Sequence, residues 1–153
     1  MKIVVSACLM GESCKYNGFD NYHRALVEAC ERTGSEVLLV CPEVFGGLPT
    51  PRKLSEIVNG EVRTCEGTSV DREFRQGAQR ALDMCEQAGG PSQIAACVLQ
   101  DRSPSCGVGR IYDGTFSGTL TAGNGVFVDL LLRHGYRVIP ASEFDPSMLE
   151  HCP

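Results

Sequence analysis

Short runs of apolar residues recur along the chain, and they have the length and composition of buried β-strands. The run EVLLVC shows no alternation of apolar and polar positions, which is typical of a strand covered on both faces of a sheet. The predicted strands are Lys2–Val5, Glu36–Cys41, Ile94–Leu99 and Tyr136–Ile139.

Longer segments between these runs place apolar residues at helical spacing, so that one face of each would turn inward. Glycines at the ends of these segments predict where the helices stop. The predicted helices are residues 21–33 with Ala25, Leu26, Ala29 and Cys30 inward and Gly34 as the stop; Asp71 to about Ala88 with Phe74, Ala78, Ala81, Leu82 and Cys85 inward and Gly89-Gly90 at its end; and Gly125–His134 with Gly135 as its cap.

Two segments carry turn chemistry instead. Residues 44–70 are rich in Gly, Pro, Thr and Ser, and Asn59-Gly60 predicts a hairpin between Leu54–Val58 and Glu61–Cys65. The Gly- and Ser-rich stretch from the third strand to Thr121 is expected to be a loop.

Strands that alternate with amphipathic helices favour a mostly parallel α/β sheet with right-handed crossovers. We therefore expect a Rossmann-like fold with helices flanking the sheet and a functional site at the carboxyl ends of the strands. No linker, repeat or low-complexity tract divides the sequence, so residues 1–153 are expected to form a single domain.

The net charge and the cysteine content exclude some classes of function. The formal charge of −5 argues against polymeric nucleic acid or an anionic membrane as the main partner, and no apolar run approaches a membrane span. The chain has nine cysteines and no tryptophan. Val5-Ser6-Ala7-Cys8 looks like a lipoprotein cleavage box, but too few apolar residues precede it. We expect a cytoplasmic protein, in which clustered cysteines indicate metal binding or catalysis more often than disulfides.

Three cysteines occupy the same position relative to the predicted strands. Cys8 follows the first strand, Cys41 ends the second, and Cys106 lies just beyond the third. Because the carboxyl ends of parallel strands meet at one crevice, these cysteines should lie near one another. The glycines and prolines around them predict tight turns with exposed N–H groups, which can hydrogen-bond thiolates or cluster sulfides.

The other six cysteines have different contexts. Cys14 follows Cys8 on the same loop and could be a fourth ligand, a reactive thiol or a packed side chain. No supporting motif accompanies Cys65 or Cys152. Cys30, Cys85 and Cys97 fall on inward positions and are expected to be core residues.

Four segments together resemble the small family that includes thiouracil desulfidase. They are SACLMGESCKYNG, CPEVFGGLPTPR, SPSCG and GRIYDGTFSG, and the match runs in order from Val5 to about Arg137. The resemblance implies an α/β domain with a 4Fe-4S cluster that removes sulfur from thiolated nucleobases without net redox change. By motif, the cluster ligands fall on Cys8, Cys41 and Cys106, the acidic residue of CPE on Glu43, and the serines of SPSC on Ser103 and Ser105.

Three cysteine ligands would leave one iron of the cluster without a protein ligand, and this open iron would act as a Lewis acid. A soft thiocarbonyl sulfur should bind it, and water activated by Glu43 could then attack the C=S carbon, with the sulfur passing to the iron. Ser103 and Ser105 could hold the heterocycle or the water, or simply stabilise a turn. Arg52 could bind an anionic group of the substrate or close its loop through a carboxylate.

Competing interpretations use the same residues. The three cysteines could serve a non-catalytic zinc, iron–sulfur or sulfur carrier, although the chain lacks the C-x(2–4)-C pairs typical of structural zinc sites. His23 is expected to be an ordinary polar residue, and Asp101 and Asp113 to be solvated or turn-forming. Ser117–Gly125 is glycine-rich before a helix but has neither nucleotide-binding motif, so a phosphate site is not favoured.

Overall fold

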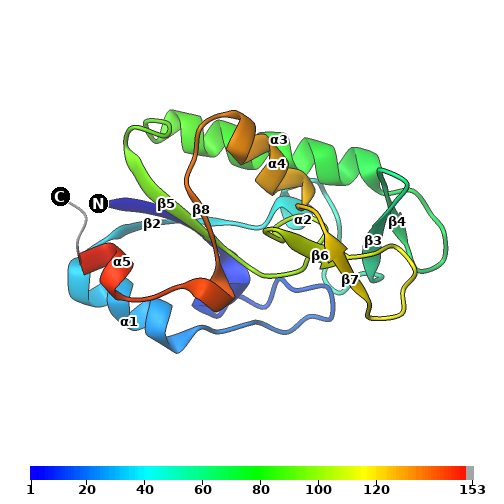
Figure 1. The fold of residues 1–153 in the computed structure, drawn as a ribbon, viewed down its shortest axis with the longest axis horizontal. Coiled ribbons are helices and arrows are strands. Elements are labelled where there is room, and N and C mark those ends of the chain that lie inside the picture. The colour runs from blue at the N-terminus through cyan, green and yellow to red at the C-terminus, as the bar shows by residue number, and fades with distance from the viewer. Residues whose placement is uncertain (151–153) are drawn as a thin grey trace.

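A parallel four-stranded sheet forms the centre of the computed structural model, which describes residues 1–150 (Figure 1). The strand order is β2-β1-β5-β8, and every neighbouring pair is parallel. This confirms the expected α/β class with a parallel sheet flanked by helices. The strands are β1 (Lys2–Ser6), β2 (Glu36–Val40), β5 (Ile94–Leu99) and β8 (Val138–Pro140).

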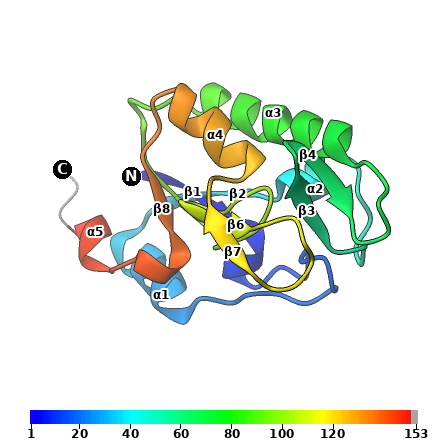
Figure 2. The ribbon, with the colours of Figure 1, turned by 45° about the vertical axis from the view of Figure 1, so that its right-hand side comes forward.

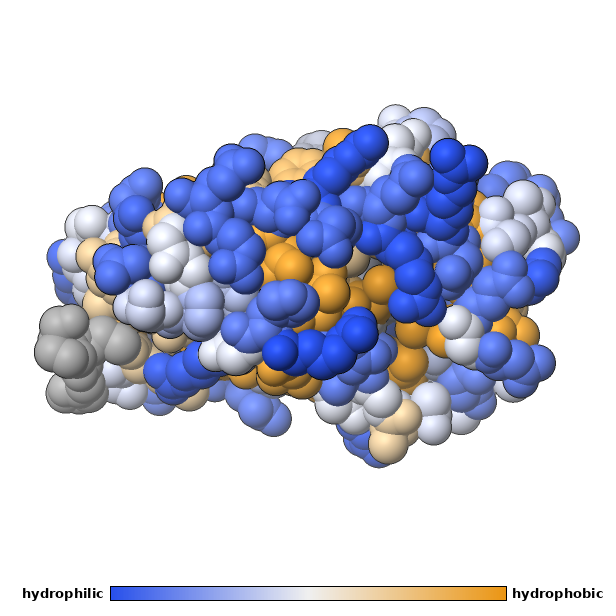
Figure 3. Space-filling view, turned by 90° about the horizontal axis from the view of Figure 1, so that it is seen from above, coloured by the Kyte–Doolittle hydropathy of each residue, from blue (hydrophilic) through white to orange (hydrophobic). Residues whose placement is uncertain are grey.

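Helices cover both faces of this sheet. The helices are α1 (Arg24–Thr33), α2 (Pro42–Phe45), α3 (Asp71–Gln87), α4 (Val126–Arg133) and α5 (Ser147–Glu150), with 3-10 turns η1 (Ala7–Met10) and η2 (Ala141–Glu143). In Figure 1, α3 and α4 lie above the sheet, and α1 and α5 lie below it. Seen from above, the surface over α3 and α4 is largely hydrophilic, with apolar atoms showing between polar side chains (Figure 3).

Alternation along β1 explains the two cores. Val4 points into the cluster that contains the inward residues of α3 and α4, whereas Ile3 and Val5 point into the cluster beneath, with Leu26 of α1. All three β1 residues are completely buried. Because β1 lies between β2 and β5, its side chains fill both layers, as expected of a central parallel strand.

Two antiparallel hairpins lie outside the central sheet, and the first of them is at the end opposite the chain termini (Figure 2). The hairpin of β3 (Ser55–Val58) and β4 (Glu61–Thr64) turns at Asn59-Gly60, as predicted. The second hairpin, β6 (Arg110–Tyr112) with β7 (Leu120–Ala122), lies where a loop was expected. That prediction was wrong because its strands are only three residues long and are embedded in glycine- and serine-rich sequence.

Several element boundaries differ from the sequence prediction by one residue, and two differ by more. The first helix begins at Arg24 instead of residue 21, because the His23 ring caps it by accepting a hydrogen bond from the Leu26 N–H. Ala25 is exposed, so its predicted inward position was wrong. The last strand is displaced towards Pro140, and Tyr136 is buried before the strand starts.

Backbone contact between helices positions α2. Gly46 follows α2 and Gly77 lies within α3. A Cβ atom at Gly77 would overlap the Pro42 carbonyl oxygen, and one at Gly46 would overlap the Glu73 carbonyl oxygen. Glycine at both positions therefore lets the two backbones touch. This contact fixes the segment that follows Cys41.

No helix in the described part of the chain is long and apolar enough to cross a lipid bilayer.

Candidate functional site

A cavity of about 220 Å³ opens at the carboxyl ends of β1, β2 and β5. Its walls come from the segments that follow these strands, and they include the three cysteines expected to meet there, Cys8, Cys41 and Cys106. The topological prediction that strand ends bring these residues to one place is thus matched by the geometry. Cys14, Glu43, Arg52, Ser103 and Ser105 line the same cavity.

Each cysteine is positioned by a different local structure. Cys8 lies in η1 directly after β1, Cys41 is the N-cap residue of α2, and Cys106 lies in the loop after β5. The exposed fractions of Cys8 and Cys106 are 9% and 5%, and Cys41 is half-buried. The three thiols are thus largely withdrawn from bulk solvent while facing a common cavity.

Burial and mutual proximity shift the pKa values of the cysteine thiols. A hydrogen bond from the Cys14 thiol lowers the pKa of Cys8 against the opposing effect of burial, and Asn21 adds to the lowering. The pKa of Cys41 is raised by its contact with Cys14 and by burial. Burial raises the pKa of Cys106 to about 12, against the lowering effect of the neighbouring Ser6 and Ser105 hydroxyl groups. Three buried thiolates would repel one another, and a bound cationic iron centre would offset that cost.

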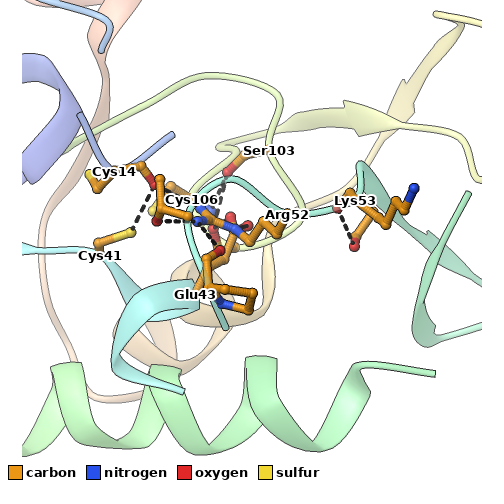
Figure 4. A network of polar contacts seen from close by, with 11 residues as sticks. Cys14, Cys41, Glu43, Arg52, Lys53, Ser103 and Cys106 are labelled. Carbon is orange, nitrogen blue, oxygen red and sulfur yellow. Dashed lines mark hydrogen bonds and ion pairs between the residues drawn. The ribbon is translucent and has the colours of Figure 1, made fainter. Parts of the chain in front are cut away.

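Cys14 belongs to the same group of thiols. Its sulfur contacts the thiols of Cys8 and Cys41, and the balance of these contacts with burial raises its pKa to about 11: the Cys41 contact lowers it, whereas the Cys8 contact and burial raise it. Its carbonyl oxygen accepts a hydrogen bond from Arg52 at 2.9 Å. Figure 4 shows Cys14 beside Cys41 and Arg52. This position is compatible with each of the three roles considered from the sequence, namely a fourth ligand, a reactive thiol or a packed side chain.

An ion pair anchors the acidic residue. Arg52 Nε donates to Glu43 Oε1 at 3.0 Å, and the side chains are only 6% and 15% exposed. The remaining guanidinium hydrogen bonds go to the carbonyl oxygens of Pro49 and Cys14 and to Thr50 Oγ1. The loop-closing contact considered for Arg52 is therefore observed, and its contact with a substrate stays a prediction.

A chain of hydroxyl groups reaches the other oxygen of Glu43. Ser105 Oγ donates to Glu43 Oε2 at 2.7 Å, and Ser103 Oγ lies 3.3 Å from Ser105 Oγ. Because the Ser105 hydrogen is used on Glu43, Ser103 donates to Ser105. The Cys106 N–H in turn donates to Ser103 Oγ at 2.8 Å. The network runs from the Cys106 backbone to the Glu43 carboxylate, and Figure 4 labels Ser103, Cys106 and Glu43 within it.

Residues outside this network divide as expected in most cases. Cys30, Cys85 and Cys97 are buried in the cores, which confirms their structural role, and Cys65 is exposed. Cys152 lies outside the described residues. His23 caps α1, and Asp113 accepts hydrogen bonds from Thr115 in a turn. Asp101 lines the cavity and accepts a hydrogen bond from the Ser142 N–H.

The glycine-rich segment before α4 supports the site from outside. Ser117–Gly125 contains β7, and the Gly125 N–H donates to the Gly107 carbonyl oxygen at 2.8 Å. A Cβ atom at Gly125 would overlap the Ser105 carbonyl group. This segment therefore packs on the loop that carries Ser105 and Cys106.

Sequence reasoning did not single out Asn21, whose side-chain amide donates to Cys8 Sγ at 3.6 Å. Nor did it single out Tyr16 and Tyr112, which also line the cavity. Tyr16 and Tyr112 lie inside the segments SACLMGESCKYNG and GRIYDGTFSG, but no motif or periodicity marks Asn21, which reaches the site only through loop geometry.

The cavity suits a metal cluster better than a single metal ion. Within residues 1–150, no three Cys, His, Asp or Glu side chains are close enough to hold a single metal ion. The three cysteines nevertheless face one cavity, and a four-iron cluster spans more space than one ion. Thiolate sulfur is the usual protein ligand of such clusters. The donor set and the cavity fit a 4Fe-4S cluster.

A parallel α/β sheet with a thiol-lined cavity at its carboxyl edge defines the class of protein. Within that class, the chain belongs to the 2-thiouracil desulfurase family, whose model matches residues 3–143. The family resemblance predicted from the four motifs is thereby confirmed, and with it the assignment to an enzyme family.

Two individual proteins are similar over nearly the whole chain. The structure of a 4Fe-4S-dependent thiouracil desulfidase, TudS, matches with a TM-score of 0.86 and 41% identity, covering 96% of this chain and 94% of the other. The uncharacterized protein YbbK of Bacillus subtilis (strain 168) is 35% identical, and the match covers 94% of this chain and 97% of YbbK.

Proposed function

We propose that this protein is a 4Fe-4S-dependent desulfidase that converts thiolated nucleobases such as thiouracil to their carbonyl counterparts. The observation that carries the proposal is the meeting of Cys8, Cys41 and Cys106 at one cavity that also contains the Glu43 carboxylate. These three cysteines would ligate the cluster. Family membership and the similarity to TudS support the same conclusion.

The cluster, when bound, would supply an iron without a protein ligand, which polarises the thiocarbonyl group and accepts the departing sulfur. The protein must supply the proton acceptor for the attacking water. Glu43 is suited to this role because it is two residues from Cys41 and lines the cavity. Each of its oxygens has one protein partner, so lone pairs remain for a water molecule.

Arg52 and Ser105 hold the carboxylate from opposite sides. A general base must be placed within hydrogen-bond reach of the proton that it takes, and two partners restrict Glu43 to one orientation. Ser105 can also carry a proton between the cavity and Glu43, since its hydroxyl both donates and accepts. Ser103 orients Ser105, and either serine can contact the heterocycle.

A thio-nucleobase is a flat, neutral ring, and the cavity has walls of a matching kind. Tyr16 and Tyr112 offer aromatic surface, while Gln100 offers an amide that can pair with ring N–H and carbonyl groups. Four of the five Arg52 N–H groups donate to the protein, so Arg52 would contact substrate through its remaining Nη2 hydrogen or through the face of its guanidinium.

The decisive experiment is a thiouracil-to-uracil assay on anaerobically reconstituted protein, with sulfide release measured in parallel. Turnover that requires the cluster supports a desulfidase. A brown protein with a full cluster but no turnover on thiouracil or on other thiolated nucleobases would instead support the alternative, a non-catalytic carrier. The buried Glu43–Arg52 pair favours the enzyme, since a carrier has no use for a positioned base.

A single domain over residues 1–153 and a cytoplasmic location remain part of the proposal.

A further inference from the structure

Asn21 is tied to Cys8 by both its backbone and its side chain. The Asn21 N–H donates to the Cys8 carbonyl oxygen at 2.9 Å, and the side-chain Nδ2 donates to Cys8 Sγ at 3.6 Å. A second backbone hydrogen bond joins the same two segments: the His23 N–H donates to the Leu9 carbonyl oxygen at 2.8 Å. The amide is therefore held against the sulfur by the backbone on which it stands.

In this contact the side-chain NH₂ group of Asn21 faces the sulfur, and it is the part of an amide that can hydrogen-bond a thiolate. The NH₂ group of asparagine is a donor, and a thiolate accepts hydrogen bonds but cannot donate. Asn21 is half-buried and lines the cavity, so water competes with the contact less than at an open surface. None of the roles assigned above requires this amide.

Hydrogen bonds to ligand sulfurs are one of the means by which proteins set the electronic properties of an iron–sulfur cluster. A donor withdraws negative charge from the thiolate and hence from the metal centre. It stabilises the reduced cluster, which carries one more negative charge, more than the oxidised cluster. The midpoint potential is consequently higher with the donor than without it.

We propose that Asn21 is a positioning residue that donates to the Cys8 ligand and keeps the bound cluster less electron-rich. This inference rests on the proposed function, because it needs Cys8 to be a ligand. Its consequence for that function is a more electrophilic open iron, which attracts a thiocarbonyl sulfur more strongly. The amide thus acts through Cys8 without touching the substrate.

The test is a redox titration of the anaerobically reconstituted protein, followed by the electron paramagnetic resonance signal of the reduced cluster. Asn21→Ala removes the donor and Asn21→Asp replaces it with an oxygen of similar shape, while both keep the backbone contact with Cys8. Asn17→Ala is the matched control, because this exposed asparagine on the same loop contacts the Phe19 N–H instead of a sulfur. We expect a more negative midpoint potential in both Asn21 variants and an unchanged value in the control.

The outcomes separate this inference from the proposed function. A parent protein that assembles no cluster overturns both. A parent with a full cluster, and Asn21 variants with the same iron content and potential, overturns the role of Asn21 alone. Where Asn21→Ala and Asn21→Asp fail to hold the cluster, Asn21→Gln decides. Cluster assembly in Asn21→Gln supports the amide donor, and failure there too overturns it.

Discussion

Glu43 has a protein partner on each carboxylate oxygen, and this arrangement predicts the effect of removing its charge. Glu43→Gln keeps the size of the side chain but removes the proton acceptor. We expect the desulfuration rate to fall by about 10²–10⁴, the usual contribution of general acid–base catalysis. Steady-state kinetics with thiouracil measures the change.

Iron content is the internal check on that variant, since Glu43 is not required as a ligand and the cluster should remain. Glu12→Gln, an exposed carboxylate on the loop that carries Cys14, is the matched control and should keep full activity. A Glu43→Gln protein with an intact cluster and the parental rate would remove Glu43 from the mechanism.

The cysteines give a second prediction at the residue scale. Replacing Cys8, Cys41 or Cys106 by Ser should abolish stable cluster binding, because each would supply one of three protein ligands. Cys30→Ala and Cys85→Ala should keep the parental iron content and lose about 1 kcal/mol of stability, because only buried packing is lost. Iron analysis and urea unfolding measure the two effects, and equal iron in all five variants would contradict the assignment.

Cys14→Ser distinguishes the three possible roles of Cys14, the fourth thiol at the cavity, which contacts Cys8 and Cys41. A side chain that only packs there leaves cluster content and activity unchanged on substitution. Loss of iron would make Cys14 a ligand, and loss of activity with full iron would make it a reactive thiol.

At the scale of elements, the contact between α2 and α3 determines where Cys41 and Glu43 stand. Gly77→Ala would place a methyl group on the Pro42 carbonyl oxygen and push α2 away from α3. We expect a loss of about 1–3 kcal/mol in the free energy of unfolding, typical of overpacking, and a drop in desulfuration activity. Gln76→Ala, on the exposed side of the same helix, should change neither. A stable and fully active Gly77→Ala protein would show that α2 can shift without disturbing the site.

Elements with helical periodicity, a continuous apolar run or a marked turn were predicted, and very short elements without such a signal were not. The helix Asp71–Gln87 was recognised because five apolar residues recur on one face over many turns. The strands of the β6–β7 hairpin and the four-residue helix α2 were missed, since three or four residues are too few to establish a period. Local sequence carries little information about elements whose stability comes from tertiary contacts.

The site shows the same division. Topology alone brought the three strand-end cysteines together, because parallel strands present their carboxyl ends at one edge. The hydrogen bond between Ser105 and Glu43 joins residues 62 positions apart, and no spacing rule predicts such a pair. The contact between Asn21 and Cys8 was not predicted for the same reason, since the Asn21 amide reaches Cys8 only through the path of a loop.

At the scale of the whole molecule, a cluster that binds only the folded chain must stabilise it. Each kcal/mol of binding free energy should raise the unfolding midpoint by about 2–4 °C for a chain of this length. Differential scanning calorimetry under anaerobic conditions should therefore give a higher midpoint for the loaded protein than after cluster removal by a chelator. Cys106→Ser should show one midpoint under both conditions. Identical midpoints for loaded and stripped parent protein would indicate that the cluster lies outside the folded core.

The position of β1 in the middle of the sheet has a consequence for how the protein is made. This strand is synthesised before the rest of the sheet, yet one of its two neighbours, β5, is synthesised only after α3. Until then one edge of β1 has no partner, and Cys8 waits without Cys106. Non-local pairing of this kind is formed late, because distant segments must be brought together first. We therefore expect cluster insertion on the three proposed ligands to require a chain that extends beyond Cys106.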